Sequence, residues 1–66
     1  MAVVKVIEII AESNDSWEVA TKNAVAEASK TIKNIATVYV KDFQAIVGKD
    51  GSLKYRVDAK ISFIVE

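Results

Sequence analysis

The side chains that most often carry out chemistry are absent from this chain. Its 66 residues include no cysteine and no histidine. Thiol nucleophiles and thiolate zinc sites are therefore excluded, as are imidazole bases and imidazole metal ligands. A serine nucleophile would lack its usual base. We therefore expect a protein that is not an enzyme.

The remaining candidates could contact a ligand by stacking or by charge. Trp17 is the only tryptophan, and it could act as a stacking platform or pack in the core or a subunit contact. Arg56 could bind a phosphate, or form an ion pair between subunits with Asp58 or a glutamate. Lys54, Arg56 and Lys60 fall on one face of the last predicted strand, where a solvated surface or one facing a lumen is the simplest interpretation.

Composition and charge limit the partners. Nine basic residues balance nine acidic ones, so neither nucleic acid nor an anionic membrane is expected as a partner. Lys5 and Glu8 interrupt the apolar start of the chain, and no segment approaches the roughly 20 apolar residues that cross a bilayer. We expect a cytoplasmic protein with a single domain over residues 1–66.

The first half of the chain predicts a strand followed by a helix. Val3–Ile10 is rich in β-branched residues and should be covered on both faces. Ser13 is the expected N-cap, and Asp15 with Glu18 has the spacing of a capping box. The helix should run to about Lys30 with one apolar stripe, made mostly of small side chains that allow close approach to a sheet. That stripe comprises Trp17, Ala20, Ala24, Ala28 and then Ile32 or Ile35.

The second half predicts a β-hairpin. Ala36–Val47 forms one strand, with a bulge expected where the alternation slips at Gln44–Val47. Gly48–Gly51 is a turn signal and not a phosphate loop, because no helix follows it. Leu53–Val65 alternates apolar and polar residues and is the clearest strand. The predicted fold class is α+β, in the order β-α-β-β.

The lengths of these elements indicate a homo-oligomer. A 13-residue strand such as Leu53–Val65 spans roughly 44 Å. A helix of about 17 residues spans only about 25 Å. The hairpin should therefore extend past the helix that covers it, with apolar ends and open strand edges that identical subunits would cover.

Taken together, the chain resembles the dodecin family over essentially its whole length. The resemblance implies a three-stranded antiparallel sheet wrapped around one helix. It also implies a homo-dodecamer that forms a hollow shell of cubic symmetry, whose flavin-binding members sequester pairs of flavins near symmetry axes. Besides the alanine-rich helix, the segments that resemble the family are Val6–Ile10, the helix start with Ser13, Thr31–Ile35 and Tyr55–Val57.

The resemblance also implies the ligand-contacting positions. Thr37 stands where flavin-binding members have a stacking tryptophan, and Arg56 where they have a glutamine. A threonine offers no flat π face, and arginine donates hydrogen bonds but accepts none. Tyr39, two residues after Thr37 on the same side of the strand, could offer a stacking ring instead or be an ordinary cross-strand aromatic.

Two functions remain open at this point. One is a shell that sequesters a small ligand such as riboflavin or FMN. The other is a flavin-free assembly that is structural or binds calcium, because Ser16–Glu18 and Tyr55–Val57 resemble calcium-binding relatives. Calcium requires six to eight oxygen ligands. Glu12, Asp15 and Asp58 could supply them only across subunits.

Overall fold

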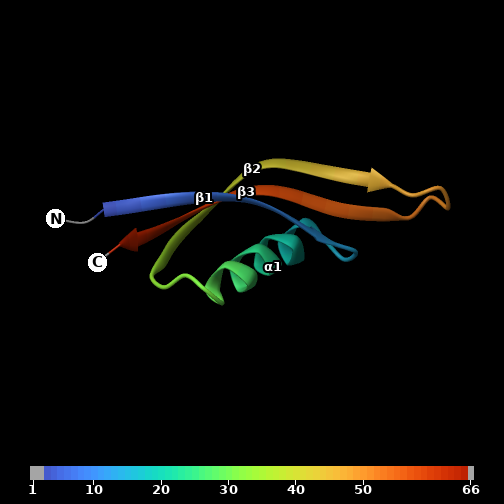
Figure 1. Ribbon diagram of the computed structural model, residues 1–66. Helices are drawn as coiled ribbons and strands as arrows, with labels where there is room; N and C mark the ends of the chain where they lie inside the picture. Colours follow the sequence, from blue (N-terminus) through green and yellow to red (C-terminus); the bar gives the residue numbers. More distant parts are fainter. Residues whose placement is uncertain (1–2, 66) are drawn as a thin grey trace.

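The computed structural model describes residues 3–65. A single helix packs on one face of a three-stranded antiparallel sheet with strand order β1-β3-β2 (Figure 1). The predicted β-α-β-β fold is confirmed. In chain order, the elements are β1 (Val3–Ser13), α1 (Trp17–Ser29), β2 (Ile35–Val47) and β3 (Leu53–Val65).

The helix begins three residues later than predicted. Ser16 is the N-cap, with extended backbone at φ −170°, and its hydroxyl accepts a 3.0 Å hydrogen bond from the amide of Val19. Ser13 is instead the last residue of β1, and its buried hydroxyl accepts from the amide of Asp15 at 2.9 Å. The capping box is therefore also wrong. Because β1 stays paired with β3 up to Ser13, the chain needs the following residues to turn.

Small side chains let the helix lie close to the sheet. Ala24 and Ala28 pack against Ile61 of β3, with Ile7 and Ile9 of β1 beside them. The predicted alanine stripe is thus confirmed, while Trp17 at its start is 37% exposed. The buried apolar core comprises Ala20, Ala24, Ala28, Val57, Ala59 and Ile61.

The bulges of β2 lie elsewhere than predicted. Register shifts occur between Ile35 and Thr37 and between Val40 and Asp42, whereas 44–47 pairs regularly with β3. Val40 lies opposite Ala59 and Phe43 opposite Val57, and both partners are buried under the helix. Val40 and Phe43 are three positions apart and would normally face opposite sides of a strand. The bulge between Val40 and Asp42 adds one residue to β2, so Phe43 stays on the helix side of the sheet.

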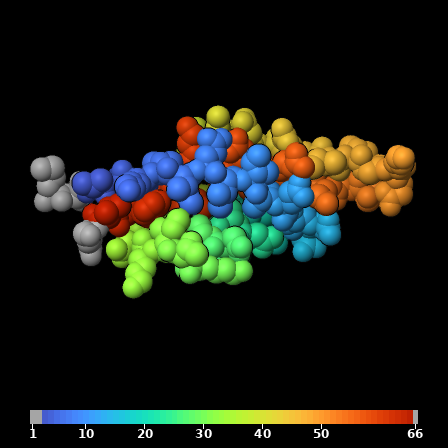
Figure 2. All heavy atoms as spheres, viewed as in Figure 1, coloured from blue at the N-terminus to red at the C-terminus, as the bar shows by residue number. Residues whose placement is uncertain are grey.

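The hairpin extends beyond the end of the helix. Its turn uses Gly51 at φ +84°, whose amide bonds the Gly48 carbonyl at 3.0 Å. The yellow and orange atoms of β2 and β3 form a narrow projection in Figure 2. The molecule measures 52 × 20 × 13 Å. Within residues 3–65, no helix is long and apolar enough to span a membrane.

Candidate ligand site on the helix-free face of the sheet

The two faces of the sheet are defined by β3. Val57, Ala59 and Ile61 are buried on the helix side, so the residues between them face the other way, onto what we call the helix-free face. Directly opposed residues in a sheet share a face. Thr37 lies opposite Ser62 and Tyr39 opposite Lys60, and both therefore lie on the helix-free face.

Thr37 presents a polar, non-aromatic surface. Its hydroxyl shares a hydrogen bond with the hydroxyl of Ser62 across the β2–β3 pair. A ligand here would meet two small hydroxyl-bearing side chains, which provide space and hydrogen bonds but no ring to stack on.

Tyr39 supplies the aromatic surface of this face. Its side chain is 64% exposed, although aromatic side chains usually bury much of their area. Lys60 lies opposite it on β3, and Glu8 of β1 is the other cross-strand neighbour of Lys60. The structure thus places Thr37 and Tyr39 side by side, as the alternation predicted.

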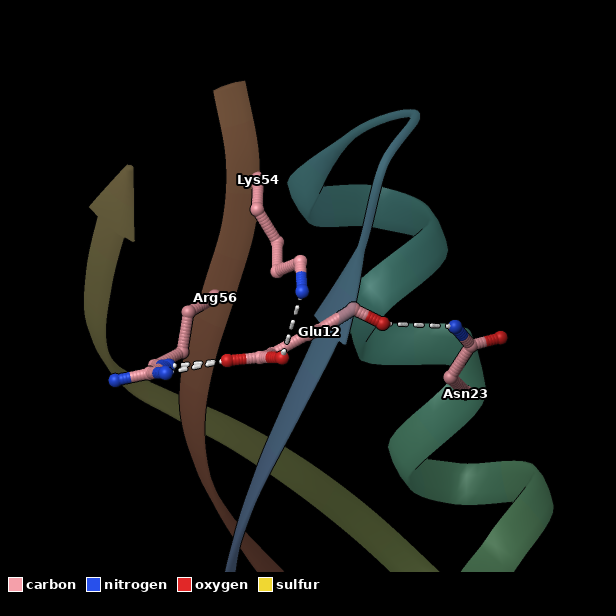
Figure 3. Close-up of polar contacts among 4 residues, drawn as sticks. All are labelled: Glu12, Asn23, Lys54 and Arg56. Carbon is pink, nitrogen blue, oxygen red and sulfur yellow. Dashed lines mark hydrogen bonds and ion pairs between the residues drawn. The ribbon is translucent and has the colours of Figure 1, made fainter. Parts of the chain in front are cut away.

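Arg56 is held by an ion pair within its own chain. Its Nε donates a 2.7 Å hydrogen bond to Oε2 of Glu12, and Lys54 Nζ lies 3.8 Å from the other carboxylate oxygen (Figure 3). The hydrogen bond from Arg56 lowers the pKa of Glu12 below its usual value. The ion pair between subunits considered from the sequence stays a prediction, whereas within one subunit the partner of Arg56 is a glutamate. That glutamate belongs to the same subunit because Glu12 and Arg56 are cross-strand partners.

One subunit does not bring all three candidate residues together. Thr37 lies opposite Ser62, whereas Arg56 lies six residues back along β3. At about 3.4 Å per residue, this separates them by roughly 20 Å along the strand. Thr37 and Arg56 of one subunit therefore lie at well-separated points of the helix-free face.

Trp17 lies on the opposite face from this site. Its ring packs edge-on against Tyr55, with centroids 4.9 Å apart, and against Phe43 at 5.9 Å. Its indole N–H donates to the carbonyl of Gln44 at 2.9 Å. Trp17 is therefore a packing residue that joins the start of the helix to the hairpin.

The carboxylates considered for calcium are dispersed within one subunit. Glu12 is engaged by Arg56, and no group of three acidic side chains within residues 3–65 is arranged to hold a metal ion. Asp58 has one buried carboxylate oxygen without a hydrogen-bond partner, and it lies opposite Asp42. Sequence analysis missed Asp42 because its pairing depends on the bulge.

The fold and this face define a class of small proteins in which one helix lies in a curved, three-stranded antiparallel sheet. The family model described as Dodecin matches residues 3–66, and the chain belongs to the dodecin family. This confirms the resemblance seen in the sequence.

Relatives of known name span nearly the whole chain. It is 36% identical to the calcium dodecin of Mycobacterium tuberculosis, over 96% of this chain and 89% of that protein. It is 30% identical to the dodecin of Thermus thermophilus, over 97% of this chain and 93% of that one.

Solved structures agree with this assignment. A crystal structure of a Thermus thermophilus dodecin mutant has a TM-score of 0.92 at 29% identity, covering 100% of this chain and 97% of that chain. The crystal structure of the calcium dodecin from Mycobacterium tuberculosis, described as having a novel calcium-binding site, has a TM-score of 0.88 at 34% identity. It covers 97% of this chain and 91% of that chain.

Proposed function

We propose that this protein is a cytoplasmic subunit of a homo-dodecameric hollow shell that sequesters a small planar ligand between subunits. Its extended shape is the observation that supports assembly. The radius of gyration is 13.5 Å, whereas a compact chain of 66 residues would have about 11 Å. A lone copy of this shape leaves its strand edges and hairpin uncovered.

The proposed ligand site combines residues from neighbouring copies. Thr37 and Tyr39 of one subunit supply hydroxyl groups and an exposed ring, and Arg56 of another supplies a cation. Thr37 of β2 lies opposite Ser62 of β3, which is roughly 20 Å along β3 from Arg56. This separation supports a site shared between two subunits. Riboflavin or FMN, the ligands that the family resemblance implies, has the flat aromatic surface that Tyr39 could stack against.

Native mass spectrometry of protein purified without added ligand tests the assembly and its cargo together. We expect a mass of twelve chains, with any bound molecule visible as added mass. The same preparation should quench the fluorescence of added riboflavin or FMN at micromolar concentration. Dodecamers that neither contain nor quench flavin would exclude these ligands, and a monomeric mass would reject the shell.

A flavin-free, calcium-binding assembly is the second candidate. Two observations favour it: the 36% identity to a protein named calcium dodecin, and the unpartnered buried oxygen of Asp58 opposite Asp42. Carboxylates of several copies would have to converge to complete the coordination shell. Calorimetric titration with calcium, and thermal melts with and without chelator, test this. If calcium gives no heat of binding and no shift in melting temperature, this candidate is rejected.

A further inference from the structure

An open cleft lies beside the base of the hairpin, where β1 ends. Its volume is about 910 Å³, within the range of pockets that bind small molecules. β1 pairs with β3 only as far as Ser13 and Tyr55, so the edge of β3 beyond Tyr55 has no neighbouring strand. Four successive residues of β3 line the cleft: Leu53, Lys54, Tyr55 and Arg56. Because successive residues of a strand face opposite sides, the cleft follows this open edge.

Two cations of this cleft converge on one carboxylate. Arg56 Nε donates a hydrogen bond to Oε2 of Glu12 at 2.7 Å, and Lys54 Nζ lies 3.8 Å from Oε1 (Figure 3). Within residues 3–65, neither cation forms an ion pair with any other carboxylate. A single negative charge is therefore shared by two positive charges.

The rest of the cleft offers apolar contacts. Ile46, Leu53 and Tyr55 line it together with the charged side chains. The ring of Tyr55 is held in place by its edge-on contact with Trp17, at a centroid distance of 4.9 Å. The cleft thus combines two cations with an apolar wall. Small-molecule sites commonly have this composition, in which a few polar groups orient a ligand that is otherwise held by apolar contacts.

The carboxylate of Glu12 can leave the two cations without any movement of the backbone. The backbone of Glu12 is fixed by its pairing with β3, and its carbonyl accepts a 3.1 Å hydrogen bond from the side chain of Asn23. Neither contact involves the carboxylate, and the side chain is 34% exposed. A rotation of this side chain towards solvent would leave Arg56 and Lys54 available to an external anion.

We propose that the cleft binds a phosphate monoester of an aromatic or aliphatic group, and that the phosphate displaces the carboxylate of Glu12 from Arg56 and Lys54. A phosphate monoester carries about −1.5 to −2 charges at pH 7, so it matches both cations, whereas Glu12 matches only one. The organic group would lie against Ile46 and Leu53. Because the cleft belongs to a single subunit, this inference goes beyond the proposed function and depends on neither the shell nor a flavin.

Arginine labelling tests the site in the wild-type protein. Arg56 is the only arginine of the chain, so phenylglyoxal labelling located by peptide mass spectrometry reports on this position alone. We expect phenyl phosphate to slow the labelling of Arg56 several-fold. Benzoate, which carries one negative charge, should protect less, and phenol should not protect at all.

Glu12→Gln tests the displacement. The substitution removes the competing charge and keeps the shape of the side chain, so phenyl phosphate should bind at least about tenfold more tightly in calorimetric titration. Glu27→Gln makes the same change of charge in a helix pair whose side chains are both 70% exposed, and it should keep the wild-type affinity. Lys54→Gln should weaken binding both in the wild-type chain and together with Glu12→Gln.

Three results would overturn the inference. The first is that phenyl phosphate neither protects Arg56 nor gives heat of binding, in wild type and in Glu12→Gln alike. The second is an equal affinity of these two proteins, which would mean that Glu12 is not displaced. The third is protection by phenol equal to that by phenyl phosphate. No probe contains a flavin or calcium, so these results are independent of the tests of the proposed function.

Discussion

The carboxylate of Glu12 in β1 accepts a 2.7 Å hydrogen bond from Nε of Arg56, its cross-strand partner in β3. The backbone carbonyl of Glu12 accepts a second bond, from the side-chain amide of Asn23 in α1 at 3.1 Å (Figure 3). Glu12 thus connects β1 to both β3 and α1, close to the end of β1. This is also where the hairpin begins to extend past the rest of the sheet.

The Glu12–Arg56 pair should make stability depend on pH. The folded state lowers the pKa of Glu12 below its ordinary value of 4.5, chiefly through the hydrogen bond from Arg56. The stabilisation is therefore present above pH 4.5 and is lost as the pH falls through the lower, folded-state pKa. We expect the melting temperature of wild type to fall over this range by more than that of Glu12→Gln.

Glu27→Gln is the matched control for this experiment. Glu27 also pairs with a cation, Lys30, but both side chains are 70% exposed, so the pair should contribute little. Glu27→Gln should follow the wild-type pH profile. A profile of Glu12→Gln that coincides with wild type would contradict the role of the pair.

Helix packing makes a second prediction about stability. Ala24 is only 1% exposed where it packs on Ile61, so Ala24→Leu would force the helix away from the sheet. Overpacking of this kind costs about 1–3 kcal/mol. The free energy of unfolding in urea, at fixed protein concentration, measures it. Ala26→Leu makes the same change at an exposed helix position and should cost little, so equal losses in both variants would contradict the close packing.

The sequence predicts the fold well because its strongest patterns arise from local chemistry. Alternation in Leu53–Val65 and the glycines of Gly48–Gly51 fix β3 and its turn regardless of the rest of the chain. The start of the helix was misplaced because Ser13 and Ser16 are both good N-caps. Only pairing with Tyr55, a long-range contact, assigns Ser13 to the strand.

The candidate site was less predictable than the fold. The side-by-side placement of Thr37 and Tyr39 follows from alternation alone. The pairing of Arg56 with Glu12 and of Asp42 with Asp58 depends on strand order and on a bulge. Neither leaves a clear signal in a single sequence, because a one-residue shift in register changes every partner.

The corrected N-cap can be tested by substitution. Ser16→Ala removes the acceptor for the amide of Val19 and should lower the free energy of unfolding by about 0.5–2 kcal/mol. Ser16→Asp keeps an acceptor and should stay close to wild type in the same urea titration. If Ser16→Ala and Ser16→Asp unfold at the same urea concentration, the hydroxyl does not cap the helix.

The identity of the ligand site is tested by restoring the side chains that the family resemblance implies for flavin binding. Thr37→Trp adds a stacking ring, and Arg56→Gln replaces a donor with a group that both donates and accepts. An aromatic stack contributes about 0.5–1.5 kcal/mol beyond area burial, so the double variant should bind riboflavin at least about two- to tenfold more tightly. Quenching of riboflavin fluorescence measures the affinity.

Thr37→Val combined with Arg56→Gln is the control, since valine matches threonine in shape but supplies no ring. Arg56→Gln also removes the main partner of Glu12, although Lys54 remains 3.8 Å from that carboxylate. The loss of stability caused by Arg56→Gln is therefore common to both double variants, while only the tryptophan variant should gain affinity. If neither gains affinity and both remain assembled, Thr37 and Arg56 do not occupy the flavin-contacting positions. The ligand surface would then lie elsewhere on the shell.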